Sequence, residues 1–317
     1  MEVTRDLLTV AAAQLAAAGV PTPQVDAELL LAHVTGRPRA LLRMAGGTVT
    51  DEQSQAYAAL VGRRVQRIPL QHLTGLAPFR HLELHVGPGV FIPRPETELM
   101  VDHVLEFGAG SGQGQGLLVV DLCSGSAALA LSIATELPGS RVIAVELSPA
   151  AVGWARRNIA DHAAQVAAVS STIELLAADA TRVAGAGEAL EHLHGRVDVV
   201  VTNPPYVPED AIPREPEVRD HDPGLALYGG PDGLEVVRPL VAQAALLLRP
   251  GGLLLVEHAD VQGDDAGELG VPAVLRAPRD AASSAPAPAW REVTDHPDLA
   301  GRPRHTAAIR ATGRMAP

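Results

Sequence analysis

The segment Asn203-Pro204-Pro205-Tyr206 combines residues that could orient a reacting group. It directly follows residues 197–201, a run of mostly β-branched apolar side chains typical of a buried strand. The two prolines donate no N–H and fix φ, so the loop is stiff, while their carbonyl oxygens remain as acceptors. A planar amino nitrogen is a poor nucleophile because its lone pair is delocalised. An Asn203 side-chain oxygen and a Pro204 carbonyl that each accept one N–H would turn that lone pair towards an electrophile.

Two interpretations of this segment are open at this point. In the first, Tyr206 packs against the planar group, and Asn203, Pro204 and Tyr206 are the catalytic residues. In the second, the segment is only a rigid strand exit with a buried tyrosine. The first is favoured because a candidate cofactor loop precedes it in the chain.

That loop follows the apolar run 117–122, which contains Asp121, and consists of small residues, 123–127, before a helical segment. Small side chains let a ligand approach the backbone, and the helix start offers free N–H groups. The next strand ends in Glu146, where an acid can accept hydrogen bonds from both hydroxyls of a ribose. Gly125 is the one glycine in the loop where a dinucleotide fold needs three, which weakens a nicotinamide or flavin interpretation.

The alternation of strand and helix patterns from residue 117 onward predicts a doubly wound parallel sheet, with ligands at the carboxyl ends of its strands. Residues 1–70 have helical spacing and predict a small all-α domain. Residues 71–94 predict a β-hairpin linker, in which HLELHV pairs with VFI across a Gly-Pro-Gly turn. Residues 95–317 form the α/β domain, and 261–290 are expected to be a loop or disordered insertion because they are rich in Ala, Pro, Gly and Asp.

Composition narrows the class of protein. The net charge of −12 argues against broad nucleic-acid binding, and we expect no direct contact with nucleic acid. A single cysteine, no signal-peptide pattern and no long apolar run predict a cytoplasmic protein without a membrane segment. The twelve histidines show no metal-binding spacing, so no metal is predicted. We expect a monomer.

The acid at the first strand end, the small loop and the acid at the second resemble Rossmann-like class I S-adenosylmethionine methyltransferases. Within that class, NPPY resembles the amino-methyltransferases that act on adenine N6 or on glutamine N5. Residues 63–105, with PLQHL at 69–73 and IPRPETE at 92–98, closely resemble the linker of the peptide chain release factor glutamine methyltransferases. This resemblance covers about residues 1–260 and returns at GRPRHTAAIR.

The resemblance implies methyl transfer from S-adenosylmethionine to the side-chain amide of the glutamine in the GGQ motif of class I release factors. It also implies that the N-terminal helical domain helps to hold the release factor. The expected cofactor-binding residues are Asp121, Cys123, Ser124, Gly125, Ser126, Ala127, Glu146, Asp179, Ala180 and Asn203. The expected substrate-binding residues are Asn203, Pro204, Pro205, Tyr206, Phe79, Arg94, Pro95 and Glu98.

The sequence departs from the family pattern in the cofactor loop. Cys123 and Ala127 stand where the family has glycine, so a positive φ at either would cost energy. Ala180 stands where the family tends to have tryptophan, which would weaken packing on adenine. Two other functions therefore stay open: an adenine-N6 nucleic-acid methyltransferase, and a non-catalytic S-adenosylmethionine-binding protein.

Overall fold

The computed structural model describes residues 2–45, 47–110, 116–277 and 290–311, and the chain divides into two compact units. The first unit comprises residues 1–76, 86–88 and 212–222, and the second comprises 77–85, 89–211 and 223–317. Each is described by itself. None of the helices in the described ranges is long and apolar enough to cross a membrane.

The first unit is mainly helical, as predicted, and its helices pack around Leu15, Leu30, Leu31 and Tyr57. Helix α4 begins after Thr50, whose side chain accepts from the Gln53 N–H in a capping box. Two-residue strands β1 and β2, which the sequence did not predict, pair with each other. The helices and strands are α1 (Thr4–Ala17), α2 (Pro23–Thr35), α3 (Arg39–Ala45), α4 (Asp51–Val65), α5 (Leu70–Thr74), α10 (Pro216–His221), β1 (Glu2–Val3) and β2 (Thr48–Val49).

Helix α10 is far in sequence from the rest of this unit. The prediction placed it in the methyltransferase domain, whereas its residues 216–221 fall within the helical unit. Glu217 accepts hydrogen bonds from Arg64 and Arg67, and Arg64 also donates to the buried Asp26 at 2.7 Å. The charges are thus paired, which buried ionic groups require.

The second unit contains a seven-stranded sheet in the order β10-β11-β9-β8-β5-β6-β7. The five strands from β9 to β7 are parallel, and β11 and β10 extend the sheet by antiparallel pairing. This confirms the predicted doubly wound α/β class. The strands are β5 (Leu118–Leu122), β6 (Arg141–Glu146), β7 (Thr172–Ala177), β8 (Val197–Thr202), β9 (Leu248–Glu257), β10 (Trp290–Pro297) and β11 (Pro303–Arg310).

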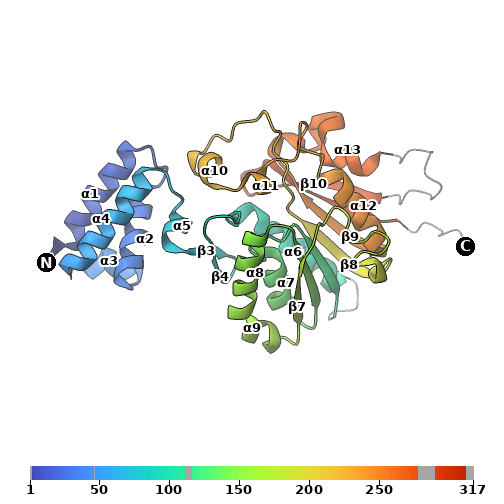
Figure 1. Cartoon of the computed structure of the whole chain (residues 1–317), viewed down its shortest axis with the longest axis horizontal. Coiled ribbons are helices and arrows are strands. Elements are labelled where there is room, and N and C mark those ends of the chain that lie inside the picture. Colours follow the sequence, from blue (N-terminus) through green and yellow to red (C-terminus); the bar gives the residue numbers. More distant parts are fainter. Residues whose placement is uncertain (1, 46, 111–115, 278–289, 312–317) are drawn as a thin grey trace, which may run out of the picture. The chain divides into compact units, whose positions relative to one another are not determined.

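Helices lie along both faces of this sheet (Figure 1). Along β5, Val119 belongs to the core cluster that includes α6 and α7, and Val120 belongs to the opposite cluster with α12 and α13. Strands buried on both faces explain the uninterrupted apolar runs in the sequence. The helices are α6 (Glu98–Gly110), α7 (Ala128–Glu136), α8 (Pro149–Asp161), α9 (Ala163–Ala168), α11 (Gly224–Leu227), α12 (Val237–Leu247) and α13 (Val271–Arg276), with short turns η1 (Pro95–Thr97), η2 (Glu191–Leu193), η3 (Asp260–Gln262) and η4 (Asp264–Leu269).

Two predictions about local structure need correction. The hairpin pairs β3 (Leu76–Phe79) with β4 (Leu82–His85), and the VFI segment is not a strand. The two-residue turn at Arg80-His81 makes this possible, because Arg80 adopts a positive φ of 52°. Residues 260–276 are not a loop but η3, η4 and α13. Buried apolar side chains of α13 fix it on the sheet despite the composition of the segment, whereas residues 278–289 lie outside the described residues.

Candidate active site

The carboxyl ends of β8, β5 and β6 lie side by side, because these three strands are neighbours in the sheet. A cavity of about 310 Å³ opens at this edge and is lined entirely by residues of the second unit. This is the position at which doubly wound sheets bind ligands. The predicted site residues that line it are Phe79, Asp121, Cys123, Ser124, Gly125, Ser126, Glu146, Asp179, Ala180, Asn203 and Pro205.

The loop after β5 adopts left-handed backbone conformations. Cys123, Gly125 and Ala127 have φ values of 66°, 58° and 67°. For the two residues that carry a Cβ, this conformation costs roughly 1 kcal/mol or more each. The Ser124 hydroxyl donates to Asp121 Oδ2 at 2.6 Å, and the Ala127 N–H donates to the Ser124 carbonyl at 2.9 Å. These hydrogen bonds offset part of the strain.

Three carboxyl groups face the cavity from successive strand ends. Burial raises the pKa of Asp121 to about 7, although hydrogen bonds from Ser124 and the backbone of Ala130 oppose the shift. Burial also raises the pKa of Glu146, whose two oxygens accept from the N–H groups of Gly125 (2.8 Å) and Ser148 (2.7 Å). Asp179 accepts both the N–H and the hydroxyl of Thr181 on Oδ1. A cationic ligand would therefore relieve the repulsion within this group.

Asn203 is oriented by a residue that the sequence did not single out. The Asn203 Nδ2 donates a hydrogen bond to the Thr97 hydroxyl oxygen at 3.4 Å. Within the described part of the chain, its Oδ1 has no hydrogen-bond donor, so that oxygen can accept from a ligand. Thr97 belongs to the IPRPETE string, but the substrate-binding residues predicted in that string were Arg94, Pro95 and Glu98.

The same Thr97 also bonds to Glu257, at the end of the next strand. The Tyr206 hydroxyl lies 3.3 Å from Glu257 Oε1, and burial raises the pKa of Tyr206. Burial raises the pKa of Glu257 to about 7, against hydrogen bonds from Thr97 and Tyr206. The four side chains Asn203, Thr97, Glu257 and Tyr206 thus form a connected chain, which runs from Asn203 and Thr97 in the cavity wall to the buried carboxyl of Glu257.

Six predicted site residues are not among those that line the cavity: Ala127, Pro204, Tyr206, Arg94, Pro95 and Glu98. Two of them have other partners. Glu98 Oε1 accepts the Arg80 N–H at 2.9 Å, which ties α6 to the hairpin turn. The Arg94 guanidinium lies 5.0 Å from the centre of the Phe91 ring, within cation–π range. Their assigned roles towards a substrate stay predictions.

Sequence reasoning missed most of the apolar wall. Phe91 and Pro93 come from the segment before α6, and Leu225 and Tyr228 come from α11 and its end. The first of these segments includes part of the IPRPETE string, on which the family resemblance rests. The motif itself was visible in the sequence, but the hydrophobic periodicity did not predict that these two segments would line one cavity.

The chain also matches known proteins over most of its length. Residues 6–75 match the PrmC N-terminal domain, and residues 79–214 match the methyltransferase small domain. A release factor glutamine methyltransferase from Bifidobacterium longum is 48% identical over 82% of this chain and 88% of its own length. Proteins of the same name are 46% identical in Mycolicibacterium smegmatis, over 96% of this chain and 97% of theirs, and 45% identical in Streptomyces coelicolor, over 94% and 95%. The chain belongs to the release factor glutamine methyltransferases.

The cofactor of this release factor glutamine methyltransferase is S-adenosylmethionine, as predicted. The cavity suits that molecule in charge and in shape. Its cationic sulfonium matches the negative potential of Asp121, Glu146 and Asp179, and the small loop lets a ligand reach the backbone. Cys123 and Ala127 keep the loop conformation that glycine would adopt freely, so the departure from the family pattern leaves the loop geometry in place.

Proposed function

We propose that the chain methylates the side-chain amide nitrogen of the glutamine in the GGQ motif of class I release factors, with Asn203 as the group that orients this amide. One observation carries the proposal. Thr97 holds the Asn203 side chain by its NH₂ group, and its oxygen is left facing a cavity bounded by three acids. Membership of the family supports the choice of substrate.

The amide nitrogen must be positioned because its lone pair is delocalised into the carbonyl group. Asn203 Oδ1 and the Pro204 carbonyl each accept one N–H, which fixes the plane of the amide. The Pro204 carbonyl accepts no backbone or side-chain hydrogen bond from the described residues. Pro204 and Pro205 fix the backbone on either side of this carbonyl, so little conformational freedom is lost when the substrate binds.

When bound, S-adenosylmethionine supplies an electrophilic methyl group on a positively charged sulfur. Asp121, Glu146 and Asp179 attract that charge, and they hold the spent, neutral cofactor less tightly. Glu146 also accepts the ribose hydroxyls, with the N–H groups of Gly125 and Ser148 keeping the carboxylate in place. No strong base is required, because the nitrogen becomes acidic as it is alkylated.

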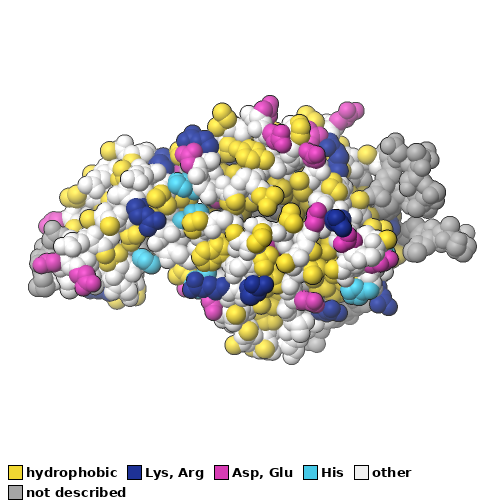
Figure 2. Space-filling model, in the orientation of Figure 1, with side chains coloured by type: hydrophobic (Ala, Val, Ile, Leu, Met, Phe, Trp, Pro, Cys, Tyr) yellow, Lys and Arg dark blue, Asp and Glu magenta, His cyan; other side chains and the backbone are white. Residues whose placement is uncertain are grey.

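Phe79, Phe91 and Tyr228 supply an apolar wall on which the aliphatic stem of the glutamine packs. We assign the binding of the release factor to the helical unit. We also propose that the protein acts as a monomer in the cytoplasm. The face in Figure 2 shows Arg side chains interspersed with Asp and Glu instead of gathered in one stretch. A protein substrate suits such a surface better than a polyanion does.

The test is methyl transfer from labelled S-adenosylmethionine to an unmodified class I release factor. Label is expected on the wild-type factor and to be absent from a factor in which the GGQ glutamine is replaced by alanine. Duplex and single-stranded DNA with adenine targets are included in parallel. Label on DNA, or equal label on the alanine variant, contradicts the proposed substrate. A calorimetric titration with no cofactor binding would contradict catalysis itself.

A further inference from the structure

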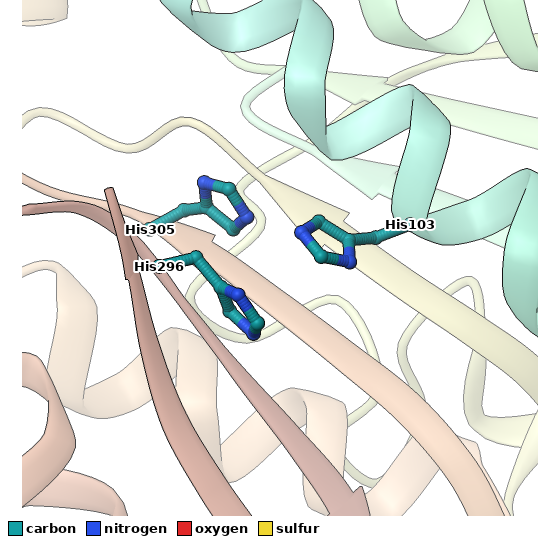
Figure 3. Close-up of side chains that lie close together, drawn as sticks. All are labelled: His103, His296 and His305. Atoms are coloured by element: carbon teal, nitrogen blue, oxygen red, sulfur yellow. The ribbon is translucent and has the colours of Figure 1, made fainter. Parts of the chain in front are cut away.

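Three histidines lie together in the second unit, and one of them, His103, is far in sequence from the other two. His103 is on α6, His296 is on β10 and His305 is on β11 (Figure 3). Their ring centres are separated by 4.4 Å (103 to 296), 4.9 Å (103 to 305) and 5.2 Å (296 to 305). None of the three lines the cavity at the strand ends, so this histidine cluster is separate from the candidate active site.

The backbone holds two of these side chains in register. His296 and His305 are directly paired across the antiparallel strands β10 and β11. Residues paired in this way project from the same face of the sheet. Helix α6 places His103 against that face, and Figure 3 shows the three rings turned towards a common centre.

The polar atoms of His305 point to a ligand. His305 is only 1% exposed, and neither of its ring nitrogens has a hydrogen-bond partner among the described residues. A buried imidazole that leaves both nitrogens unsatisfied is costly, and buried polar side chains in native proteins nearly always have a partner. The His305 ring packs against the two other imidazoles, whose nitrogens can bind the same ligand.

We propose that His103, His296 and His305 bind a divalent transition-metal ion of the zinc class. One nitrogen from each ring lies within 4.8 Å of the others. In a tetrahedral site with metal–nitrogen distances of about 2.0–2.1 Å, ligand nitrogens are about 3.3 Å apart, so small ring rotations are enough. Imidazole ligands without a thiolate suit Zn²⁺, Ni²⁺ and Cu²⁺.

The environment of His305 disfavours its charged form. Burial, followed by the neighbouring His103, His296, His258 and Arg304, lowers the pKa of His305, and the neutral imidazole is the form that binds a metal. Burial and His103 also lower the pKa of His296, whereas Asp295 and Glu106 oppose this shift.

Glu106 is the candidate for the fourth ligand. It lies one turn after His103 on α6, and its Oε2 is 3.8 Å from His103 Nδ1. Its side chain is 77% exposed and is therefore free to turn towards the three rings. Three histidines and one carboxylate complete a tetrahedral set. Such an ion would fasten α6 to the β10–β11 hairpin, a structural role that does not depend on the proposed methyl transfer.

The experiment measures zinc binding to the full chain after chelator treatment and gel filtration. Calorimetry is expected to give one tightly bound Zn²⁺ per chain, and a hundredfold excess over the dissociation constant should raise the melting temperature by about 5–10 °C. Co²⁺ in place of Zn²⁺ should show the intense visible absorption of a tetrahedral site. No binding of either ion, or a weak octahedral Co²⁺ spectrum, overturns the proposal.

Variants separate the cluster from other histidines. His103→Gln and His296→Gln change half-buried residues and should each weaken zinc binding by about 100-fold or more, with unchanged circular dichroism. Glu106→Gln should weaken it by less than about 10-fold, since water can replace this ligand. His192→Gln is the matched control, because His192 is exposed on η2. Equal binding by the first two variants and wild type, or equal loss in the control, contradicts the assignment.

Discussion

The loop after β5 is built from small residues in left-handed conformations, whereas the loop after β8 is built around two prolines. In the first, strain at Cys123 and Ala127 is held by hydrogen bonds to buried groups. In the second, covalent rings fix the backbone, and Thr97 orients the Asn203 side chain. Under the proposed function, the two loops divide two tasks at one cavity: the β5 loop lets a cofactor approach the backbone closely, and the β8 loop places two acceptor atoms.

The largest effect on activity is expected from a substitution in the loop after β8. Asn203→Ala removes the oxygen that accepts the substrate N–H, so kcat should fall by about 10²–10³-fold. The cofactor dissociation constant should change by less than about threefold. Single-turnover methylation and calorimetry measure the two quantities. Equal losses in both would mean that the two loops do not divide the tasks in this way.

The corresponding change on the β5–β6 side is Glu146→Ala. It removes the acceptor for the ribose hydroxyls and releases the N–H groups of Gly125 and Ser148. Cofactor affinity should weaken by about 100-fold, because charge-assisted hydrogen bonds are lost, while kcat at saturating cofactor changes little. Glu174→Ala is the control, since it removes the same charge from a side chain that is 64% exposed. A drop in kcat larger than the loss of affinity would reverse the assignment.

A third prediction concerns the carboxyl group behind the β8 loop. Burial raises the pKa of Glu257 from about 4.5 to about 7, so its stabilising contribution is complete below pH 4.5 and is lost as the pH rises through 7. The Glu257→Gln variant has no carboxyl group to ionise at this position, so its stability is not lowered in this way at high pH. Its free energy of unfolding should exceed that of wild type by about 1–3 kcal/mol at pH 8 and should not exceed it at pH 4.5.

The measurement is chemical denaturation at pH 4.5 and pH 8, followed by circular dichroism. Glu83→Gln is the control, since this residue is exposed on β4. A Glu257 variant that loses as much stability as wild type between these pH values would show that the buried carboxyl is not the titrating group.

The smallest effect tests the strain in the β5 loop. Ala127→Gly gains roughly 1 kcal/mol by relieving the left-handed conformation and loses about 0.8 kcal/mol by removing a buried methyl group, so stability should change by less than about 0.5 kcal/mol. Ala128→Gly, in the first turn of α7, should destabilise by about 1 kcal/mol or more. Thermal unfolding measures both. Equal destabilisation would show that the loop carries no strain.

The sequence predicted the strands of the sheet and the ends at which the ligand binds. This was possible because apolar runs such as 197–201 are buried on both faces and stop at polar or proline residues. Composition was misleading at 261–276, because the buried Val271 and Leu275 hold α13 against the sheet although the segment is rich in Gly, Ala and Asp. Local pattern likewise could not choose the hairpin partner, which depends on the conformation of Arg80.

The residues that line the cavity were predictable where they stand at the end of a strand or directly after it, and unpredictable where they come from other parts of the chain. Asp121, Glu146 and Asn203 belong to the first class. Thr97 belongs to the second, because its role depends on its approach to Asn203 in the folded chain. The histidine cluster is a further case, since no local spacing links position 103 to positions 296 and 305, which are paired in the β10–β11 hairpin.

The return of α10 to the helical unit has a consequence for synthesis on the ribosome. Asp26 and Arg64 emerge early, but Glu217 follows Arg67, its partner, by 150 residues. At 5–20 residues per second, this interval is about 8–30 s. The nascent helices therefore spend that time with Arg67 short of its counter-ion and with Arg64 paired to Asp26 alone, and the unit that begins first is completed only after β8 has been made.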